Sequence, residues 1–347
     1  ANKVAFSHSF WVVDNSGSMQ TNGEYIQHDL LFPYYSCLLF SFYTDGQRIV
    51  RNKGGQYKKL SCSRWAEMQD TVDYHAQLAA LSKTPTTFRL LNDPGRVVGP
   101  QVFSIAADGG SSIDQDLTIA QQTMMNAQPG GVTPLARHVQ EIRDQVHSME
   151  ANLRQMGTKV SVVLATDGTP TDERGNSSDL VKRSFVEAVR LLEGLPVWIV
   201  VRLCTNEDAV VDYWSDLDSQ LELSLEVLDD FCAEAAEIHS FNPWLTYALP
   251  LHRMRELGFY HAVFDAIDER KLSRDEVRDL LKLIFGKGRL SEAPDPEIDW
   301  KAFSRLVAEL NAKEAKQWNP VMNKMTPWID MKKLNKLYGP SSFFGLF

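Results

Sequence analysis

Short apolar runs alternate with segments of helical periodicity along the first two thirds of the chain. The runs are mostly rich in valine, isoleucine, leucine or phenylalanine and predict strands over 10–13, 87–91, 97–106, 159–165, 197–203 and 223–227. Between them, apolar residues recur every three or four positions and predict helices over about 65–79, 113–127, 134–155, 178–193 and 208–220. Strands that alternate with helices are typical of a parallel sheet covered on both faces. The pattern therefore predicts an α/β fold.

Oxygen-bearing side chains follow two of these strands at their carboxyl ends. The run "FWVVD" ends in Asp14 and continues to Ser16 and Ser18, and "VSVVLATD" ends in Asp167. A third loop, "GGVTPLARH", carries Thr133 before a proline suited to a first helical turn. In open α/β sheets ligands bind at the carboxyl ends of the strands. We therefore expect the three loops to meet at one edge of the sheet.

Together the three loops resemble those of von Willebrand factor A (VWA) domains. "DNSGSM" is similar to the family's DxSxS motif, "GGVTPL" to its threonine loop, and "LATDG" to the loop of its last metal-coordinating aspartate. The five oxygen positions of the family's metal ion-dependent adhesion site (MIDAS) are matched in order by Asp14, Ser16, Ser18, Thr133 and Asp167. The resemblance covers roughly residues 4–240. It implies a Rossmann-like VWA domain with a mostly parallel central sheet flanked by helices.

The residue types at these five positions suit a small hard cation. Mg²⁺ takes about six oxygen ligands near 2.0–2.1 Å, and Mn²⁺ or Ca²⁺ are the alternatives. Hydroxyls bind such an ion without neutralising it, so the ion keeps positive charge and an open position for a carboxylate of another molecule. Aspartate and serine at this spacing also cap helices, and the addition of Thr133 and Asp167 favours the metal. We expect a non-catalytic protein that binds an acidic side chain of a protein partner through the metal.

Two other functions remain alternatives. One is a metal-dependent hydrolase in which Asp14 and Asp167 hold the ion and water is the nucleophile. It needs a general base, and Asp172 and Glu173 are the only nearby acids. The other is a scaffold subunit whose metal only makes the loop rigid. The common nucleotide-binding and hydrolase motifs, GxxxxGK[ST], GxGxxG, GxSxG and HExxH, are absent from the sequence.

An atypical insertion over 20–64 departs from the family pattern, in which the DxSxS loop runs directly into the first helix. Its segment Gly23–Thr44 is aromatic and apolar without a clear period, whereas "DGQRIVRNKGGQYKK" follows with a very different composition. Three interpretations stay open for this segment: a partner-binding loop near the metal, a cover packed on the domain, or a translated intron that the functional protein lacks.

Helices take over beyond residue 240, so we expect a helical C-terminal region over 241–347. "FDAIDERKLSRDEVRDLLKLIF" predicts a helix, a short loop and a second helix opened by a capping box of Ser273 and Glu276. "PEIDWKAFSRLVAEL" repeats this plan, and the two units at 255–312 resemble a degenerate EF-hand pair. A plain helical extension is the alternative.

Calcium ligands are incomplete in both units. In the first unit Ile267 and Glu269 fall at the middle ligand positions and Arg270 stands where glycine is needed; in the second, Ala302 occupies the place of the bidentate glutamate. We therefore expect no calcium binding there. The tail that follows carries Trp318 and Trp328 ahead of a lysine-rich stretch. It either docks on its own domain or serves as a short recognition segment.

Composition narrows the classes of partner. The chain has 347 residues, of which 44% are hydrophobic, enough for a sizeable core and for two domains. The 36 basic residues against 45 acidic ones give a formal net charge of −9, so nucleic acid and anionic membranes are not expected partners. The longest apolar stretch, Leu30–Tyr43, is interrupted by Pro33 and is too short for a membrane span.

Cysteine usage indicates the compartment. The residues Cys37, Cys62, Cys204 and Cys232 stand far apart with no CxxC pair, which favours an intracellular, cytoplasmic setting. The sequence does not begin with methionine, so a targeting segment removed earlier stays an open alternative.

Overall fold

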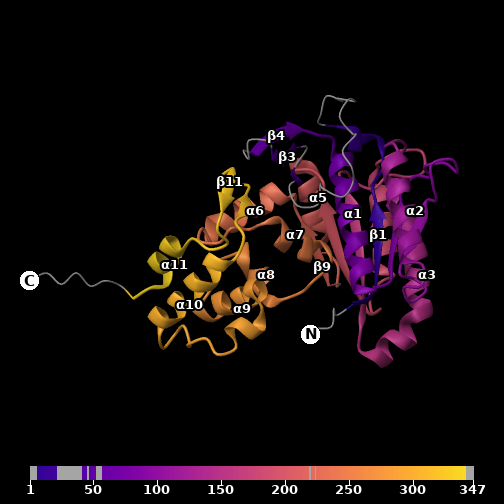
Figure 1. Cartoon of the computed structure of the whole chain (residues 1–347). Coiled ribbons are helices and arrows are strands. Elements are labelled where there is room, and N and C mark those ends of the chain that lie inside the picture. Colours follow the sequence, from indigo (N-terminus) through magenta and orange to yellow (C-terminus); the bar gives the residue numbers. More distant parts are fainter. Residues whose placement is uncertain are drawn as a thin grey trace, which may run out of the picture. The chain divides into compact units, whose positions relative to one another are not determined.

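The computed structural model describes residues 6–21, 41–44, 47–51, 57–218, 220–222 and 224–340. The chain divides into two compact units (Figure 1). Unit 1 comprises Ala1–Asp230 together with Met254–Phe259, and unit 2 comprises Phe231–Arg253 together with Tyr260–Phe347. The division falls before the expected boundary at residue 240, and a short segment beyond that boundary belongs to unit 1.

A six-stranded sheet forms the centre of unit 1. Its strands are β1 (Phe6–Val13), β5 (Thr86–Leu90), β6 (Val102–Ile105), β7 (Lys159–Thr166), β8 (Val197–Leu203) and β9 (Leu225–Leu228). Their order is β6-β5-β1-β7-β8-β9, and every neighbouring pair is parallel except β5 and β6. Val12 pairs with Arg89 on one side and with Leu164 on the other. The carboxyl ends of β5, β1 and β7 therefore lie side by side at one edge.

Five helices cover the two faces of this sheet: α1 (Arg64–Ser82), α2 (Ile113–Asn126), α3 (Leu135–Met156), α4 (Asp179–Arg190) and α5 (Asp208–Asp218). Apolar residues of α1 and α2 pack with Trp11 and Val163 in one buried cluster. Those of α3, α4 and α5 pack with Phe10 and Val162 in another. Because successive strand residues point to opposite faces, β1, β7 and β8 contribute residues to both clusters, whereas β5 and β6 contribute only to the cluster that contains Trp11. The predicted mixed α/β fold with a mostly parallel sheet is confirmed.

One predicted strand is shorter than expected. The run 97–106 contributes only β6, which is antiparallel to β5. Its first part forms a turn, in which the Val98 amide donates to the Gly95 carbonyl (2.9 Å) and Gly95 has a φ of +92°. Gly99 lies against Thr123, so an added Cβ would stand 2.2 Å from the threonine hydroxyl. The turn and this close approach keep the first part of the run out of the strand, although Val97 and Val98 are apolar. The strand therefore begins only at Val102.

The expected insertion contains a small antiparallel sheet. Its strands are β2 (Ser41–Thr44), β3 (Gln47–Arg51) and β4 (Tyr57–Ser61), in the order β2-β3-β4. Of the segment Gly23–Thr44, only Ser41–Thr44 is among the described residues. The three interpretations of that segment therefore concern residues that lie mainly outside the described part of the chain.

Unit 2 consists mainly of helices. Its elements are α6 (Phe231–Phe241), the first part of α7 (Leu249–Glu256), α8 (Ala262–Ile267), α9 (Arg274–Phe285), the 3-10 helix η2 (Lys287–Leu290), α10 (Trp300–Lys313), β10 (Gln317–Asn319), β11 (Lys324–Thr326) and α11 (Met331–Tyr338). The predicted capping box is confirmed at the start of α9, where Ser273 and Glu276 exchange side-chain and backbone hydrogen bonds. The likeness to an EF-hand pair stays a prediction.

The tail of the chain packs within unit 2. Trp318 on β10 is buried. Leu245 and Ile329 form an isolated antiparallel bridge, and the Tyr338 hydroxyl donates to the Leu272 carbonyl (2.8 Å). These contacts agree with a tail docked on its own domain.

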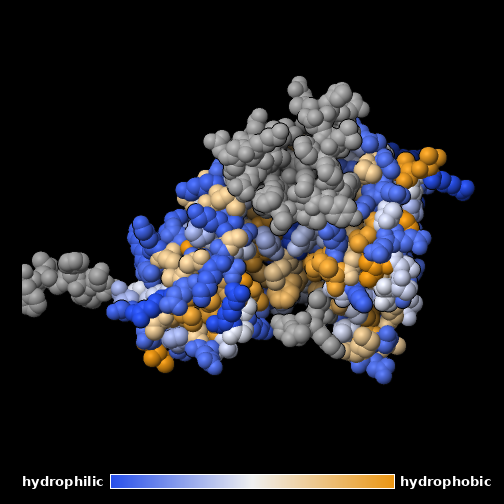
Figure 2. All heavy atoms as spheres, viewed as in Figure 1, coloured by the Kyte–Doolittle hydropathy of each residue, from blue (hydrophilic) through white to orange (hydrophobic). Residues whose placement is uncertain are grey.

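Hydrophilic and hydrophobic residues are interspersed on the described surface that Figure 2 draws. Large apolar side chains such as Leu81, Val97 and Leu180 are exposed. Among the helices within the described ranges, none has both the length and the apolar character that crossing a bilayer demands.

Candidate functional site

Asp14 lies directly beyond the end of β1 and is fully buried. Its amide donates to the Ala165 carbonyl of β7 (2.9 Å), so the ladder between the two strands continues one residue past the strand. Each carboxylate oxygen accepts a hydrogen bond: Oδ1 from the Ser16 amide (2.8 Å) and Oδ2 from the Thr166 hydroxyl (2.6 Å). The sheet and the following turn thus hold the Asp14 side chain in one orientation.

A chain of hydrogen bonds runs from Ser16 to Asp167. The hydroxyls of Ser16 and Ser18 are 2.9 Å apart, and Ser18 donates to Oδ1 of Asp167 (2.7 Å). Ser18 lies in the short 3-10 helix η1 (Gly17–Gln20), whereas Asp167 follows β7. The structure therefore brings together four of the five predicted residues, and they are linked by direct hydrogen bonds.

The loop of Thr133, the fifth residue, reaches the first loop through its backbone. Gly130 donates to the Asn15 carbonyl (2.8 Å), and Gly17 donates to the Gly131 carbonyl (3.3 Å). The Thr133 amide donates to the Thr171 hydroxyl, and the Thr171 amide donates to the Thr133 carbonyl, both at 2.9 Å. The Thr133 side-chain hydroxyl has no hydrogen-bond partner among the described residues. Thr133 as a residue is buried, and its side chain is not hydrogen-bonded to those of the other four predicted residues.

An asparagine pair joins these loops to the end of β5. The Asn92 amide donates to the Asn15 side-chain oxygen (2.8 Å), and the Asn92 side chain bonds to both the carbonyl and the amide of Val132. Gly131 has a φ of +88°, and an added Cβ would lie 2.5 Å from the Asn92 side chain. Asn15 and Asn92 were not predicted from the sequence, since neither stands at a ligand position of the motif.

The two carboxylates repel each other. The pKa of Asp14 is raised to about 6, first by burial and then by the negative charge of Asp167; the hydrogen bonds from Thr166 and Ser16 act in the opposite direction. Burial disfavours the charged form of a carboxylate, and a nearby like charge does the same. A cation between the two carboxylates would offset both the cost of burying their charges and their mutual repulsion.

Arg64 is a further residue of the site that sequence analysis missed. Its guanidinium donates through Nη1 to Oδ2 of Asp167 (3.0 Å) and through Nη2 to Thr205 (2.9 Å) and to Oε1 of Glu207 (2.8 Å). The side chain is only 4% exposed. The one signal in the sequence is its position directly after Ser63, the N-cap of α1, where a cation opposes the helix dipole.

The donor set fits a small hard cation. It offers two buried carboxylates and the hydroxyls of serine and threonine, all oxygen ligands of the kind that Mg²⁺ and Mn²⁺ accept. Within the described ranges no group of three or more histidine, cysteine, aspartate or glutamate side chains is placed to hold a metal ion. The candidate site is of a different kind, since hydroxyls supply most of its ligands.

The two acids considered as a general base are engaged elsewhere. Asp172 is exposed and accepts hydrogen bonds from Asn176 and from the Arg174 amide, which lower its pKa. Glu173 pairs with Arg137 (3.4 Å). Neither carboxylate is hydrogen-bonded to a predicted metal ligand, so the contacts in the structure add no support to the hydrolase alternative.

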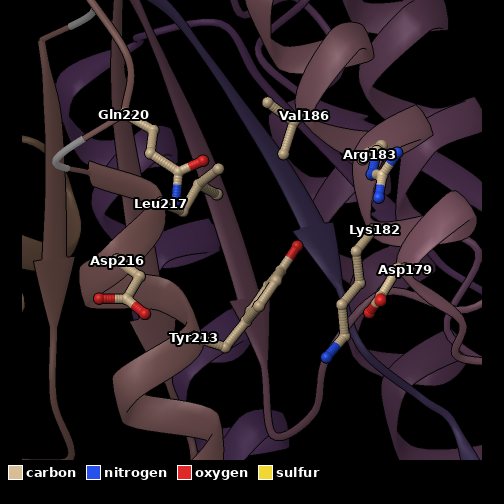
Figure 3. A pocket seen from close by; sticks show the side chains of 8 residues that line it. All are labelled: Asp179, Lys182, Arg183, Val186, Tyr213, Asp216, Leu217 and Gln220. Atoms are coloured by element: carbon tan, nitrogen blue, oxygen red, sulfur yellow. The ribbon is translucent and has the colours of Figure 1, made fainter.

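A separate hollow of about 240 Å³ lies between α4 and α5. It is lined by Asp179, Lys182, Arg183, Val186, Tyr213, Asp216, Leu217 and Gln220. Figure 3 shows Tyr213 between the side chains of the two helices, and the Lys182 ammonium lies 5.1 Å from the centre of its ring. None of the five predicted metal ligands lines this hollow.

The chain matches no protein-family model and no curated protein. Two solved structures that resemble it are the PilB minor pilin from Streptococcus sanguinis, at 14% identity and a TM-score of 0.36, and a mutant of the same pilin, at 13% identity and a TM-score of 0.37. Each match covers 64% of this chain and 56% of the pilin chain, so this chain spans about half the length of those proteins. Likeness of this degree defines neither the family nor the function.

Proposed function

We propose that this chain is a non-catalytic VWA protein that binds a divalent metal ion, Mg²⁺ or Mn²⁺, at Asp14, Ser16, Ser18, Thr133 and Asp167. A protein partner supplies an acidic side chain to the ion. The observation that carries the proposal is the connected set of oxygens at the edge of the sheet, in which Ser16 and Ser18 link the loop of Asp14 to Asp167. The spacing of the cysteines supports an intracellular setting for this binding.

The roles of the residues follow from their charges. Asp14 and Asp167 would attract the ion, and the hydroxyls of Ser16 and Ser18 would add ligands without adding negative charge. The bound ion supplies an electrophilic position that a carboxylate from outside can occupy. Thr133 is the residue suited to respond to that carboxylate, because its hydroxyl is not held by another described residue.

Metal binding is tested by titration calorimetry with Mn²⁺ on the wild type, Asp14→Ala and Asp167→Ala. Both variants lose a carboxylate ligand, so we expect binding to be lost while thermal unfolding remains cooperative. Asp108→Ala is the matched control, since Asp108 is an exposed carboxylate that accepts hydrogen bonds from Ser111 and Ser112. Unchanged affinity in both site variants would rule out the proposed metal site.

Partner binding is tested by a pull-down with wild type, Thr133→Ala, and wild type with a chelator. In the resembled family the threonine binds the ion directly chiefly when the outside carboxylate is engaged. Only a difference in interaction between two states can shift their balance, so Thr133→Ala should weaken partner binding more than metal binding. Equal recovery of the same partners in all three samples would favour the scaffold alternative, in which the metal is structural.

A further inference from the structure

Arg64 places a fixed positive charge beside the candidate metal ligands. It is the first residue of α1, and its guanidinium reaches Asp167, Thr205 and Glu207 with hydrogen bonds of 2.8–3.0 Å. A cation in the first turn of a helix interacts unfavourably with the helix dipole. The helix itself therefore gains nothing from this arginine, and the carboxylates of Asp167 and Glu207 account for its position.

Asp167 is shared between two sets of groups. Its Oδ1 accepts from Ser18, a predicted metal ligand, and its Oδ2 accepts from Arg64. A divalent ion at Asp14 and Asp167 would lie close to the guanidinium, and both are positively charged. Because Asp167 and Arg64 are buried, solvent screens this repulsion only weakly. The ion and the guanidinium thus compete for the same negative charge.

Glu207 gives the guanidinium a second carboxylate. Its side chain is 59% exposed, whereas that of Asp167 is fully buried. Thr205 holds the same Nη2 atom that contacts Glu207, and its hydroxyl also accepts from the Glu207 amide (3.2 Å). Arg64 therefore keeps two anchors if Asp167 turns toward a metal ion.

From this arrangement we propose that Arg64 is an internal counter-cation that lowers the affinity of the site for divalent metal by pairing with Asp167. Glu207 is the acceptor that takes over the guanidinium when the metal binds. This inference rests on the proposed function and names the residues that set the metal affinity of that site. A merely structural role for Arg64 makes the opposite prediction, because loss of an orienting residue weakens metal binding.

The test is titration calorimetry with Mn²⁺ at pH about 7.5. Arg64→Met removes the charge but keeps a long side chain, and Arg64→Lys keeps the charge. Glu207→Gln removes the second acceptor. Arg89→Met is the matched control, because Arg89 pairs with Glu141, which is not a metal ligand, and its side chain is 11% exposed. Thermal unfolding is recorded for each variant.

A unit charge within contact distance changes the proton affinity of a carboxylate by about tenfold to a thousandfold, and a metal ion responds in the same direction. We therefore expect Arg64→Met to bind Mn²⁺ at least about tenfold more tightly than wild type. Arg64→Lys should stay close to wild type, Glu207→Gln should bind several-fold more weakly, and Arg89→Met should not change.

Equal or weaker binding by Arg64→Met overturns the inference while the proposed function stands, provided that wild type binds and Asp14→Ala does not. If Arg64→Met does not fold, Glu207→Gln decides: unchanged or tighter binding overturns the inference. If neither wild type nor any variant binds Mn²⁺, the proposed function fails and the inference fails with it. Mn²⁺ binding by Arg64→Met, with no detectable binding by wild type, also supports the inference.

Discussion

Replacing Asp14 with asparagine separates the charge of this residue from its shape. In the structure Oδ1 accepts from the Ser16 amide and Oδ2 from the Thr166 hydroxyl. Asparagine keeps the oxygen that the Ser16 amide needs, and the Thr166 hydroxyl can turn to accept from the new amide group. The hydrogen bonds therefore persist, and the change that remains is the loss of one buried negative charge.

The magnitude follows from the raised pKa. The pKa of Asp14 rises from its ordinary value of 3.8 to about 6 in the folded protein. The folded state therefore holds the proton more tightly than the unfolded state. The stability that protonated Asp14 contributes is fully present below pH 3.8 and is lost as the pH rises through about 6. The difference corresponds to about 3 kcal/mol. Without metal at neutral pH, Asp14→Asn should therefore be more stable than wild type by up to this amount.

Saturating Mn²⁺ should make wild type more stable than Asp14→Asn. An ion at a thousand times its dissociation constant adds about 4.1 kcal/mol to the protein that binds it, which exceeds the difference of about 3 kcal/mol in favour of Asp14→Asn, and only wild type keeps the ligand. The assay is urea unfolding followed by tryptophan fluorescence, in chelator and in saturating Mn²⁺, at pH about 7.5 and at pH about 4. Below pH about 4 the two proteins should be equally stable, because both then carry a neutral group at this position.

One outcome in chelator would refute this reasoning: Asp14→Asn less stable than wild type at pH about 7.5, above the raised pKa. In that case the hydrogen bonds to the carboxylate outweigh its desolvation and its repulsion by Asp167. Failure of Mn²⁺ to stabilise wild type would instead count against the metal site and leave the electrostatic argument intact.

Three further changes have defined outcomes. Glu256→Ala leaves the buried Arg202 without one of its two carboxylates and should cost about 3–5 kcal/mol in urea unfolding; a loss below about 1 kcal/mol, the value of an exposed pair, would contradict this. Gly131→Ala forces a positive φ on alanine and meets Asn92, so stability should fall by about 1–2 kcal/mol with weaker Mn²⁺ binding; tighter binding would contradict the loop assignment. Calcium titration of a variant that lacks the candidate metal site should give no heat, because Glu276 accepts two hydrogen bonds from an arginine; micromolar binding would revive the EF-hand interpretation.

Local periodicity was sufficient to predict most elements of the six-stranded sheet and its covering helices, but not the small sheet of β2, β3 and β4. Strands β1, β5, β7, β8 and β9 and helices α1 to α5 lie where apolar spacing places them, because burial against a sheet imposes a period on each segment separately. The pattern failed for 97–106, where the apolar run is broken by a turn at Gly95 and by the approach of Gly99 to Thr123. Hydrophobicity alone does not distinguish a strand from an apolar turn.

The residues of the candidate site also fall into two groups: those predicted from the sequence and those that only the structure places there. The motifs alone identified Asp14, Ser16, Ser18, Thr133 and Asp167, because each stands at the end of a strand or the start of a helix, and parallel strands bring their carboxyl ends together. Only the tertiary structure decided which groups surround these oxygens. Arg64 and Asp167 are 103 positions apart, and the hydrogen bond between them depends on how α1 packs beside β7 and β8. No local pattern encodes that packing, so the positive charge beside the proposed metal ligands was decided by the fold.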